Sequence, residues 1–455
     1  MAAEGRNHIL LVLFIGVLMG ALDIAIVGPA LPAIGEYFSA DTRNLTWIYT
    51  IYVLFFMVGT PLMAKLSDRM GRRFIYILDV ALFGVGSFIT ATSPSLEILL
   101  LGRAIQGLGA GGIFPVASAF IGDIFPPEKR GGALGTIGAV FGIAYLIGPI
   151  LGGLIISYGW QWLFAINIPV AILVVILSFL VLPKTSRTDG KHFDWPGMLT
   201  LGGALAGLTY AINHINTEEL LASISSLEVW PFLVLFLLFI IIFWKVEERA
   251  QDPIIRINLF KNLQITLVSL ISIFSGLNEA GLIFIPAFSI VALGFNNAMA
   301  SLMLLPAVVA MAIGAPTIGR ILDKTGSKIL MVTGGVMLAI GLFIFGFYGY
   351  QFHYFILSGI FIGVGLSALL GAPVRYIMLN EFPVSERATG QGLININSST
   401  GQLIGGALIG AIIASMGGDV SAYGFAYICL AISAVILTFL AIGLKGRSAE
   451  LDMMK

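Results

Sequence analysis

The sequence predicts an all-α integral membrane protein that crosses the bilayer fourteen times. Of its 455 residues, 58% are hydrophobic and only 11% are charged, whereas soluble domains carry about 25% charged residues. The apolar residues fall into fourteen runs, and each is close to the roughly 20 residues that a membrane-spanning helix needs. Lys and Arg gather in alternate loops between these runs, as expected for a protein threaded through a membrane.

Each span is an apolar run bounded by a polar or turn-rich break. The first run follows Arg6 and is too long for the apolar core of a signal peptide, so we expect a retained helix there. To within a few residues, we expect spans at 9–30, 46–64, 74–92, 97–120, 132–156, 163–183, 196–213, 230–246, 264–291, 299–319, 328–348, 353–374, 390–415 and 422–444.

The distribution of basic residues fixes the expected orientation. With an even number of spans both termini lie on one side, and 22 of the 24 Lys and Arg residues then fall on that side. The two exceptions are Arg43, in an outer loop, and Arg103, inside a span. The positive-inside rule therefore predicts that both termini face the cytoplasm. We expect the protein in the plasma membrane, which in a bacterium is the cell inner membrane.

Composition also excludes several classes of function. The formal net charge of zero argues against a nucleic-acid partner. The single cysteine, Cys429, excludes an intrachain disulfide framework and a cysteine-cluster metal site. No HExxH, Walker loop or Cys/His ligand cluster occurs, so we expect neither an enzyme nor a bound metal. A membrane enzyme and a non-transporting receptor remain the alternatives from other classes.

Two motifs recur along the chain. AKLSDRMGRR at 64–73 matches GRILDKTGSK at 319–328 at an offset of 255. FPPEKRGGALG at 125–135 matches FPVSERATGQG at 382–392 at an offset of 257. Repeated halves are common in secondary transporters, whose substrate sites lie near the bilayer midplane where the halves meet.

The repeat predicts how the chain is divided. We expect a six-helix half at 1–185, two inserted helices with flanking cytoplasmic linkers at 186–263, and a second six-helix half at 264–455. A weaker match, at an offset of 256, places Asp23 over Glu279.

Four motifs in order resemble the major facilitator superfamily, and specifically its fourteen-helix drug:proton antiporter branch. AKLSDRMGRR is similar to the signature loop between helices 2 and 3, and LLLGRAIQGLGAG at 99–111 resembles the helix 4 motif. AYLIGPILGG at 144–153 resembles the helix 5 antiporter motif, with Ala144 where glycine is common. LDIAIVGPALP at 22–32 resembles the helix 1 motif, but departs from it at Ala25, Gly28 and Pro29.

The resemblance covers essentially the whole chain and implies a function. It implies a major facilitator fold and a proton-driven antiporter that exports amphipathic or cationic small molecules by alternating access. A proton gradient would supply the energy, so no cofactor is expected. The partners would be a small-molecule substrate, protons and membrane lipid, and no feature of the sequence demands more than a monomer. The alternative on the same fold is an exporter of one metabolite or lipid-like molecule.

The deepest charges in the predicted spans are Asp23, Arg103 and Glu279. A charge at mid-bilayer costs about 2.5–3.5 kcal/mol on insertion scales, so such residues face protein or water and usually serve a function. We expect Asp23 and Arg103 to lie near each other, with Glu279 facing them from the second half, as a proton-coupling site. The alternative is a structural ion pair.

The inner loop at 64–73 has a second expected role. Its basic residues are adequately explained as topology determinants, but its acid is not. The resemblance implies that this loop latches the cytoplasmic ends of helices when the carrier opens outward. The residues of this conformational latch are Asp68, Arg69, Gly71, Arg72 and Arg73. Asp79, six residues beyond Arg73, is expected to be structural.

Two further sets complete the candidate site. Gly148, Pro149, Gly152 and Gly153 form the antiporter-helix set; close helix packing is the alternative reading of the glycines, and a kink at Pro149 is expected. For substrate contact, Asn395, Ser399 and Gln402 lie on one face of a helix. The other candidates are Asp23, Gln106, Asn278 and Glu279.

Overall fold

The computed structural model describes residues 3–39, 42–185, 193–216 and 219–452, which form helices and connecting turns without a strand. The N-terminal helices are α1 (Ala3–Phe38), α2 (Thr42–Met70), α3 (Arg72–Ala91), α4 (Leu96–Ile124), α5 (Pro127–Ile155), η1 (Ile156–Tyr158), α6 (Gln161–Ala165) and α7 (Asn167–Val181). The middle helices are α8 (Trp195–Asn213), α9 (Leu220–Ile224), α10 (Trp230–Glu247) and η2 (Ile257–Lys261). The C-terminal helices are α11 (Leu263–Glu279), α12 (Gly281–Leu293), α13 (Asn297–Leu302), α14 (Leu305–Thr325), α15 (Ser327–Tyr348), α16 (Phe352–Leu369), α17 (Ala372–Glu381), η3 (Val384–Glu386), α18 (Arg387–Ser415), α19 (Val420–Ile442) and α20 (Arg447–Asp452).

Thirteen helical segments in the described ranges are long and apolar enough to cross a membrane. The protein is therefore an integral membrane protein, but the expected count of fourteen is not confirmed. The difference lies at α8, which occupies the expected span at 196–213 without qualifying as a candidate. Its glycines, threonines and tyrosine lower its mean hydropathy, although it carries no charge.

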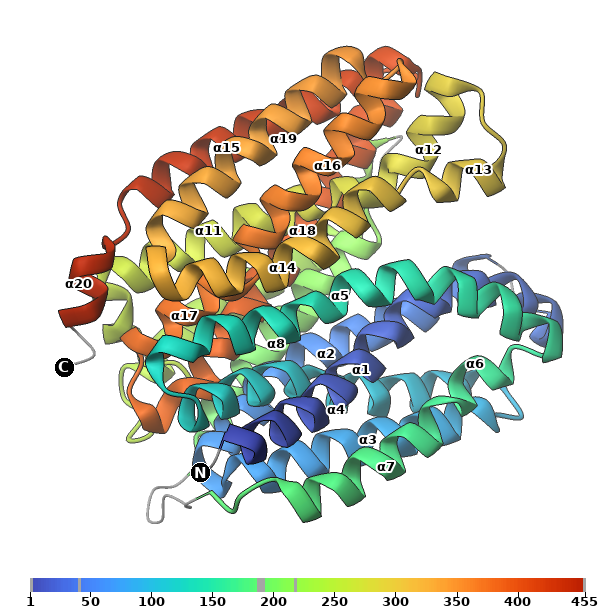
Figure 1. The fold of residues 1–455 in the computed structure, drawn as a ribbon. Helices are drawn as coiled ribbons and strands as arrows, with labels where there is room; N and C mark the ends of the chain where they lie inside the picture. The colour runs from blue at the N-terminus through green and yellow to red at the C-terminus, as the bar shows by residue number, and fades with distance from the viewer. Residues whose placement is uncertain (1–2, 40–41, 186–192, 217–218, 453–455) are drawn as a thin grey trace.

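Figure 1 shows long helices that run between two ends of the molecule, with both chain termini at one of them. We call this the terminal end. The first helix group comprises α1–α7 and the second comprises α11–α20. The two groups meet where α5 packs along α14 and α2 packs along α18. Helix α8 packs on α2 and on α10, and α10 turns most of its apolar side chains outward, as expected for a helix that faces lipid.

Small residues allow the close approach of α5 to α14. A Cβ on Gly135 would lie 2.6 Å from the carbonyl oxygen of Ala315, and a Cβ on Gly142 would lie 2.7 Å from Ala312. Contacts of this kind need glycine on at least one helix. They hold the two helix groups together over several turns.

Glycine also sets the turns at the two copies of the repeated loop. Gly71 joins α2 to α3 with φ of 98°, and Gly326 joins α14 to α15 with φ of 85°. Side chains with a Cβ rarely adopt positive φ. The offset of 255 residues between these glycines therefore corresponds to the same backbone turn in both helix groups.

Short polar side chains begin several helices by capping their first amides. Asp194 accepts a hydrogen bond from the amide of Gly197 at the start of α8 (2.8 Å), and Asp419 accepts one from Ala422 at the start of α19 (2.9 Å). Asn262 caps α11 through the amide of Gln264 (2.9 Å). These caps satisfy amides that have no partner inside the helix.

The segment after α10 bridges the two helix groups at the terminal end. The Glu247 carboxylate accepts hydrogen bonds from the amides of Ile254 and Ile255, both at 3.2 Å, and so folds this segment back on α10. Lys65 of α2 donates to Asp252 (2.8 Å). Four residues further on, Arg256 pairs with Glu386 of η3, beside α18, at 2.6 Å.

Candidate functional site

A buried polar network joins α1 and α4. Arg103 Nη1 donates to Asp23 Oδ2 (2.6 Å) and to Gln106 Oε1 (2.7 Å), and Gln106 Nε2 donates to Asp23 Oδ1 (2.8 Å). All three side chains have no exposed surface. Arg103 and Gln106 lie three residues apart on one face of α4, so both reach the same carboxylate. The structure thus brings together the acid and the arginine that the sequence predicts to be neighbours.

Two further polar side chains complete this network. Asn167 Nδ2, at the start of α7, donates to Asp23 Oδ1 (3.2 Å), and Gln106 Nε2 also donates to Ser87 Oγ of α3 (2.9 Å). Sequence reasoning missed both residues. Uncharged polar residues are frequent in membrane helices, and only the depth of Asn167 and Ser87 in apolar runs could have drawn attention to them.

Aromatic rings cover the guanidinium of Arg103. Its central carbon lies 4.2 Å from the ring centroid of Tyr52 and 5.5 Å from that of Phe164. Its Nε donates to the carbonyl oxygen of Ile48 (3.3 Å), but its Nη2 has no hydrogen-bond partner in the described part of the chain. The network therefore retains an unused donor next to the carboxylate.

Glu279 ends α11 in the second helix group and does not touch Asp23. Its carboxylate has no hydrogen-bond or ion-pair partner among the described residues. Tyr49 of α2 interacts electrostatically with both Glu279 and Arg103. The two acids are therefore not in contact, and Tyr49 is the residue influenced by both sites.

The expected substrate-contacting residues divide into two sets. Asn278 Nδ2 donates to Ser433 Oγ of α19 (2.8 Å), and Asn395 accepts a hydrogen bond from Arg375 (2.9 Å), so both are used within the second helix group. Ser399 and Gln402 are partly buried and make no side-chain hydrogen bond in the described ranges. They lie on the stretch of α18 that packs along the last turns of α11.

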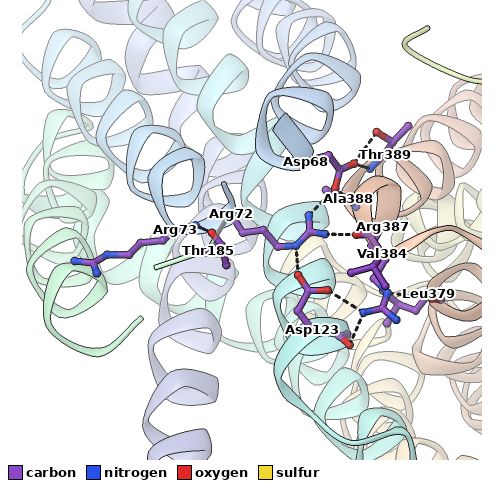
Figure 2. Close-up of polar contacts among 11 residues, drawn as sticks. Asp68, Arg72, Arg73, Asp123, Thr185, Leu379, Val384, Arg387, Ala388 and Thr389 are labelled. Atoms are coloured by element: carbon purple, nitrogen blue, oxygen red, sulfur yellow. Dashed lines mark hydrogen bonds and ion pairs between the residues drawn. The ribbon is translucent and has the colours of Figure 1, made fainter. Parts of the chain in front are cut away.

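A second polar cluster joins the two helix groups at the terminal end, and we call it the clasp (Figure 2). The Asp68 carboxylate accepts hydrogen bonds from the amides of Ala388 (3.0 Å) and Thr389 (2.8 Å), which begin α18, and from the Thr389 hydroxyl (2.8 Å). A carboxylate is well placed at the positive end of a helix dipole. These bonds tie α2 to α18.

Arginines complete the clasp. Arg72 pairs with Asp68 (2.6 Å) and with Asp123 of α4, and its Nη2 donates to the carbonyl oxygen of Val384 (2.9 Å). Arg387 of α18 donates to Asp123 Oδ1 (2.9 Å). Sequence reasoning missed Asp123, although the 257-residue offset aligns it with Asn380 and could have drawn attention to it.

The repeat explains the geometry of the clasp, because each copy bonds to the other. Asp323, the counterpart of Asp68, accepts hydrogen bonds from the amides of Gly131 (2.9 Å) and Gly132 (3.0 Å) at the start of α5. Those glycines are the counterparts of Ala388 and Thr389. Likewise Arg387 binds Asp123, whereas its counterpart Arg130 donates to Asn380 (3.2 Å).

Three of the five expected latch residues make no bond in the clasp. Arg73 points away from Arg72 (Figure 2). It donates instead to the carbonyl oxygen of Phe179 in α7 (2.6 Å). Arg69 makes no hydrogen bond or ion pair in the described ranges. Gly71 contributes the turn rather than a contact between the groups.

Comparison with known proteins decides the family. A model of the Major Facilitator Superfamily matches residues 13–250 and 268–451. The chain belongs to this superfamily. Members of the superfamily are transporters, so the protein is a transporter and not an enzyme.

Individual superfamily members agree with this assignment. The uncharacterized MFS-type transporter YfiU of Bacillus subtilis is 33% identical over 84% of this chain and 75% of its own length. Multidrug resistance protein 3 of the same organism is 31% identical over 74% of this chain and 65% of its own length. The crystal structure of the human organic anion transporter MFSD10 (TETRAN) matches with a TM-score of 0.74, covering 97% of this chain and 100% of that one, at 16% identity. That likeness shows the superfamily fold alone.

The antiporter-helix residues lie in the C-terminal half of α5, away from the terminal end. Gly148 is buried directly against Ala25 of α1, where a side chain would collide. Gly153 has open space around its Cα and imposes no such limit. Gly152 is buried. The chain stays helical through Pro149, whose side chain lies outside the described part of the structure.

Asp79 lies apart from both polar clusters. It is fully buried between α3 and α4, against Gly112, and neither carboxylate oxygen has a hydrogen-bond partner among the described residues. It makes no contact with the clasp or with the Asp23 network in the part of the chain that the structure describes.

Proposed function

We propose that this transporter is a proton-coupled antiporter that exports amphipathic or cationic small molecules by alternating access. The observation that carries the proposal is the fully buried Asp23 carboxylate, held by Arg103 and Gln106 beside an unused guanidinium donor. Titratable groups inside a membrane are expensive, and they commonly mark ion and substrate pathways. The printed names of relatives such as Multidrug resistance protein 3 support the substrate class.

The proposed coupling uses two carboxylates. Protonation of Asp23 removes the charge that Arg103 neutralises, so the guanidinium would turn its free Nη2 to a new acceptor. Glu279 has no such partner among the described residues, and Tyr49 interacts electrostatically with both Glu279 and Arg103. In this scheme a proton from outside neutralises one of these acids, displaces the substrate and resets the carrier. Ser399 and Gln402 would contact the substrate directly, whereas Gln106, Asn278 and Asn395 would join only after leaving their present partners.

The clasp is the proposed latch of the outward-open state. We assign the terminal end to the cytoplasm. In the expected topology 22 of the 24 Lys and Arg residues lie on the same side as the two termini, and the positive-inside rule makes that side cytoplasmic. The protein would then lie in the cell inner membrane as a monomer. We retain the proposed division into halves at 1–185 and 264–455 with an inserted pair at 186–263, and α8 as the fourteenth span. The hydrogen bonds that join the groups through the clasp support a closed cytoplasmic side.

A transport assay tests this function. Proteoliposomes with an imposed pH gradient should accumulate a cationic dye, and a protonophore should abolish the accumulation. A substrate panel separates the alternative, an exporter of one metabolite or lipid-like molecule: transport of several unrelated cations favours the main proposal, and transport of a single compound favours the alternative. Dye accumulation that does not depend on the pH gradient would contradict proton coupling.

Glu279→Gln should abolish efflux driven by the pH gradient while leaving substrate exchange without a gradient intact. The carboxylate makes no hydrogen bond within the described ranges, so a neutral amide of equal size loses no partner and the melting temperature should change little. The measurement compares pH-driven transport with counterflow in the same vesicles. Glu219→Gln, the same change at an exposed position, is the matched control. Wild-type pH-driven transport in Glu279→Gln would remove this residue from the coupling scheme.

A further inference from the structure

Arg375 of α17 is a second buried cation, outside the Asp23 network. Its side chain is 5% exposed. Nη2 donates to Asn395 Oδ1 (2.9 Å) and Nη1 donates to Gln391 Oε1 (3.3 Å), both on α18. Both acceptors are neutral amides. No carboxylate among the described residues pairs with this guanidinium.

This arrangement is unusual within the molecule itself. Three arginines are buried in the described ranges, namely Arg72, Arg103 and Arg375. The first two are paired with carboxylates at 2.6 Å, and Arg375 alone is not. Burying a charge without a counter-charge is costly, so a structure that keeps one suggests that an anion occupies the site at some stage.

The guanidinium also has donors left for that anion. An arginine offers five N–H groups, and here the Nε group has no hydrogen-bond partner in the described part of the chain. Nε and the adjacent Nη form a planar pair that matches the two oxygens of a carboxylate or phosphate. The neutral acceptors Asn395 and Gln391 hold the guanidinium in place without neutralising it.

An aromatic ring from the other helix group covers the site. The central carbon of Arg375 lies 3.7 Å from the ring centroid of Phe114 on α4, and this ring packs edge-on against Phe141 of α5 (4.9 Å between centroids). A cation–π contact stabilises a cation but does not neutralise it. Because Phe114 belongs to the first group and Arg375 to the second, separation of the groups at the terminal end would uncover the guanidinium.

We propose that Arg375, positioned by Gln391 and Asn395, binds an oxyanion group of an amphipathic substrate that enters from the cytoplasm. This rests on the proposed export function and narrows its substrates to include molecules that carry a carboxylate, phosphate or sulfonate beside an apolar ring. Phe114 and Phe141 supply the surface for that ring. The same oxyanion chemistry occurs in the headgroups of anionic lipids, and the experiment separates the two sources.

The test uses a rhodamine dye with a free carboxyl group and its methyl ester, which differ only in the oxyanion. Binding of both dyes to the purified full-length protein is measured by fluorescence anisotropy, and pH-driven transport is measured in proteoliposomes. In Arg375→Gln, affinity for the acid should fall about tenfold or more, as expected for loss of a charge-assisted hydrogen-bonded pair. Affinity for the ester and its transport should stay near wild type. Arg375→Lys keeps the charge but loses the planar pair, so its affinity for the acid should lie between those of wild type and Arg375→Gln.

Controls make each outcome decisive. Arg320→Gln removes a positive charge from an exposed position on α14. It should change neither the affinity for either dye nor the transport of either dye. Equal affinities of Arg375→Gln and wild type for the acid would overturn the inference while leaving proton-driven transport of the ester, and so the proposed function, intact. Wild-type vesicles that transport neither dye would instead count against the proposed function, and the acid-to-ester binding ratio would still test Arg375. If Arg375→Gln lowers dye binding or transport in phosphatidylglycerol vesicles but not in phosphatidylcholine vesicles, the site binds a lipid headgroup. That result would overturn the substrate assignment.

Discussion

Asp23→Asn should abolish pH-driven efflux and lower the stability of the protein at the same time. The Asp23 carboxylate accepts hydrogen bonds from Arg103, Gln106 and Asn167 with no exposed surface. Removing its charge leaves the buried Arg103 guanidinium uncompensated, which typically costs about 3–5 kcal/mol. Transport in proteoliposomes should fall to the level of empty vesicles. The melting temperature in detergent should fall clearly below that of Asp419→Asn, the same change at an exposed helix cap.

A double variant separates the two effects. Asp23→Asn combined with Arg103→Gln removes both charges, so the penalty of an unpaired buried charge disappears and stability should largely return. Transport should stay absent, because the titratable acid is still missing. Recovery of pH-driven efflux in the double variant would instead mean that Asp23 serves only to neutralise Arg103, which is the structural ion-pair alternative.

Asp68→Asn should open the terminal end of the molecule. The carboxylate accepts three hydrogen bonds from the start of α18 and one from Arg72. An amide presents one acceptor atom instead of two and no charge. Hydrogen bonds to a charged group are worth about 1.5–3 kcal/mol each, so even one lost bond should shift the equilibrium towards the open end by about tenfold to a hundredfold.

Distances between two spin labels, obtained by double electron–electron resonance, measure this opening directly. Spin labels at the exposed positions Lys129 and Ser385, in a Cys429→Ala background, report the separation of α5 from η3. Asp68→Asn should lengthen the distance distribution and reduce transport. Asp323→Asn, which loses bonds to only two amides, should act in the same direction but less strongly. An unchanged distribution in both variants would contradict a latch role for the clasp.

The sequence predicts the helices and one charge pair well, for a physical reason. Isolated charges such as Asp23 and Arg103 stand out in apolar runs, and two opposite charges at similar depth are expected to pair. Asn167 and Ser87 carry no comparable cost, so no rule marks them in advance. The repeat predicts that Asp68 and Asp323 make equivalent bonds, since they occupy equivalent positions, but it does not say that each bonds to the other helix group.

Arg375 shows where sequence reasoning fails. The apolar run at 353–374 ends just before it, and so the sequence places the arginine among the cytoplasmic loops. In the structure the helix is interrupted near Gly371 and resumes as α17, within the same candidate span. The apolar residues Ile377, Met378 and Leu379 after the arginine were the available signal. Likewise α8 is helical at the expected place, but its glycines keep its mean hydropathy too low to mark it as a candidate membrane span.

The bridging segment between α10 and η2 sets a limit on motion. It is attached to Lys65 on α2 through Asp252 and to Glu386 beside α18 through Arg256, so only a few residues of chain connect the two attachments. Such a short tether has little slack. If α2 and α18 move apart at the terminal end, one of these ion pairs must break first. Any such movement is therefore coupled to α10 and to the segment that follows it.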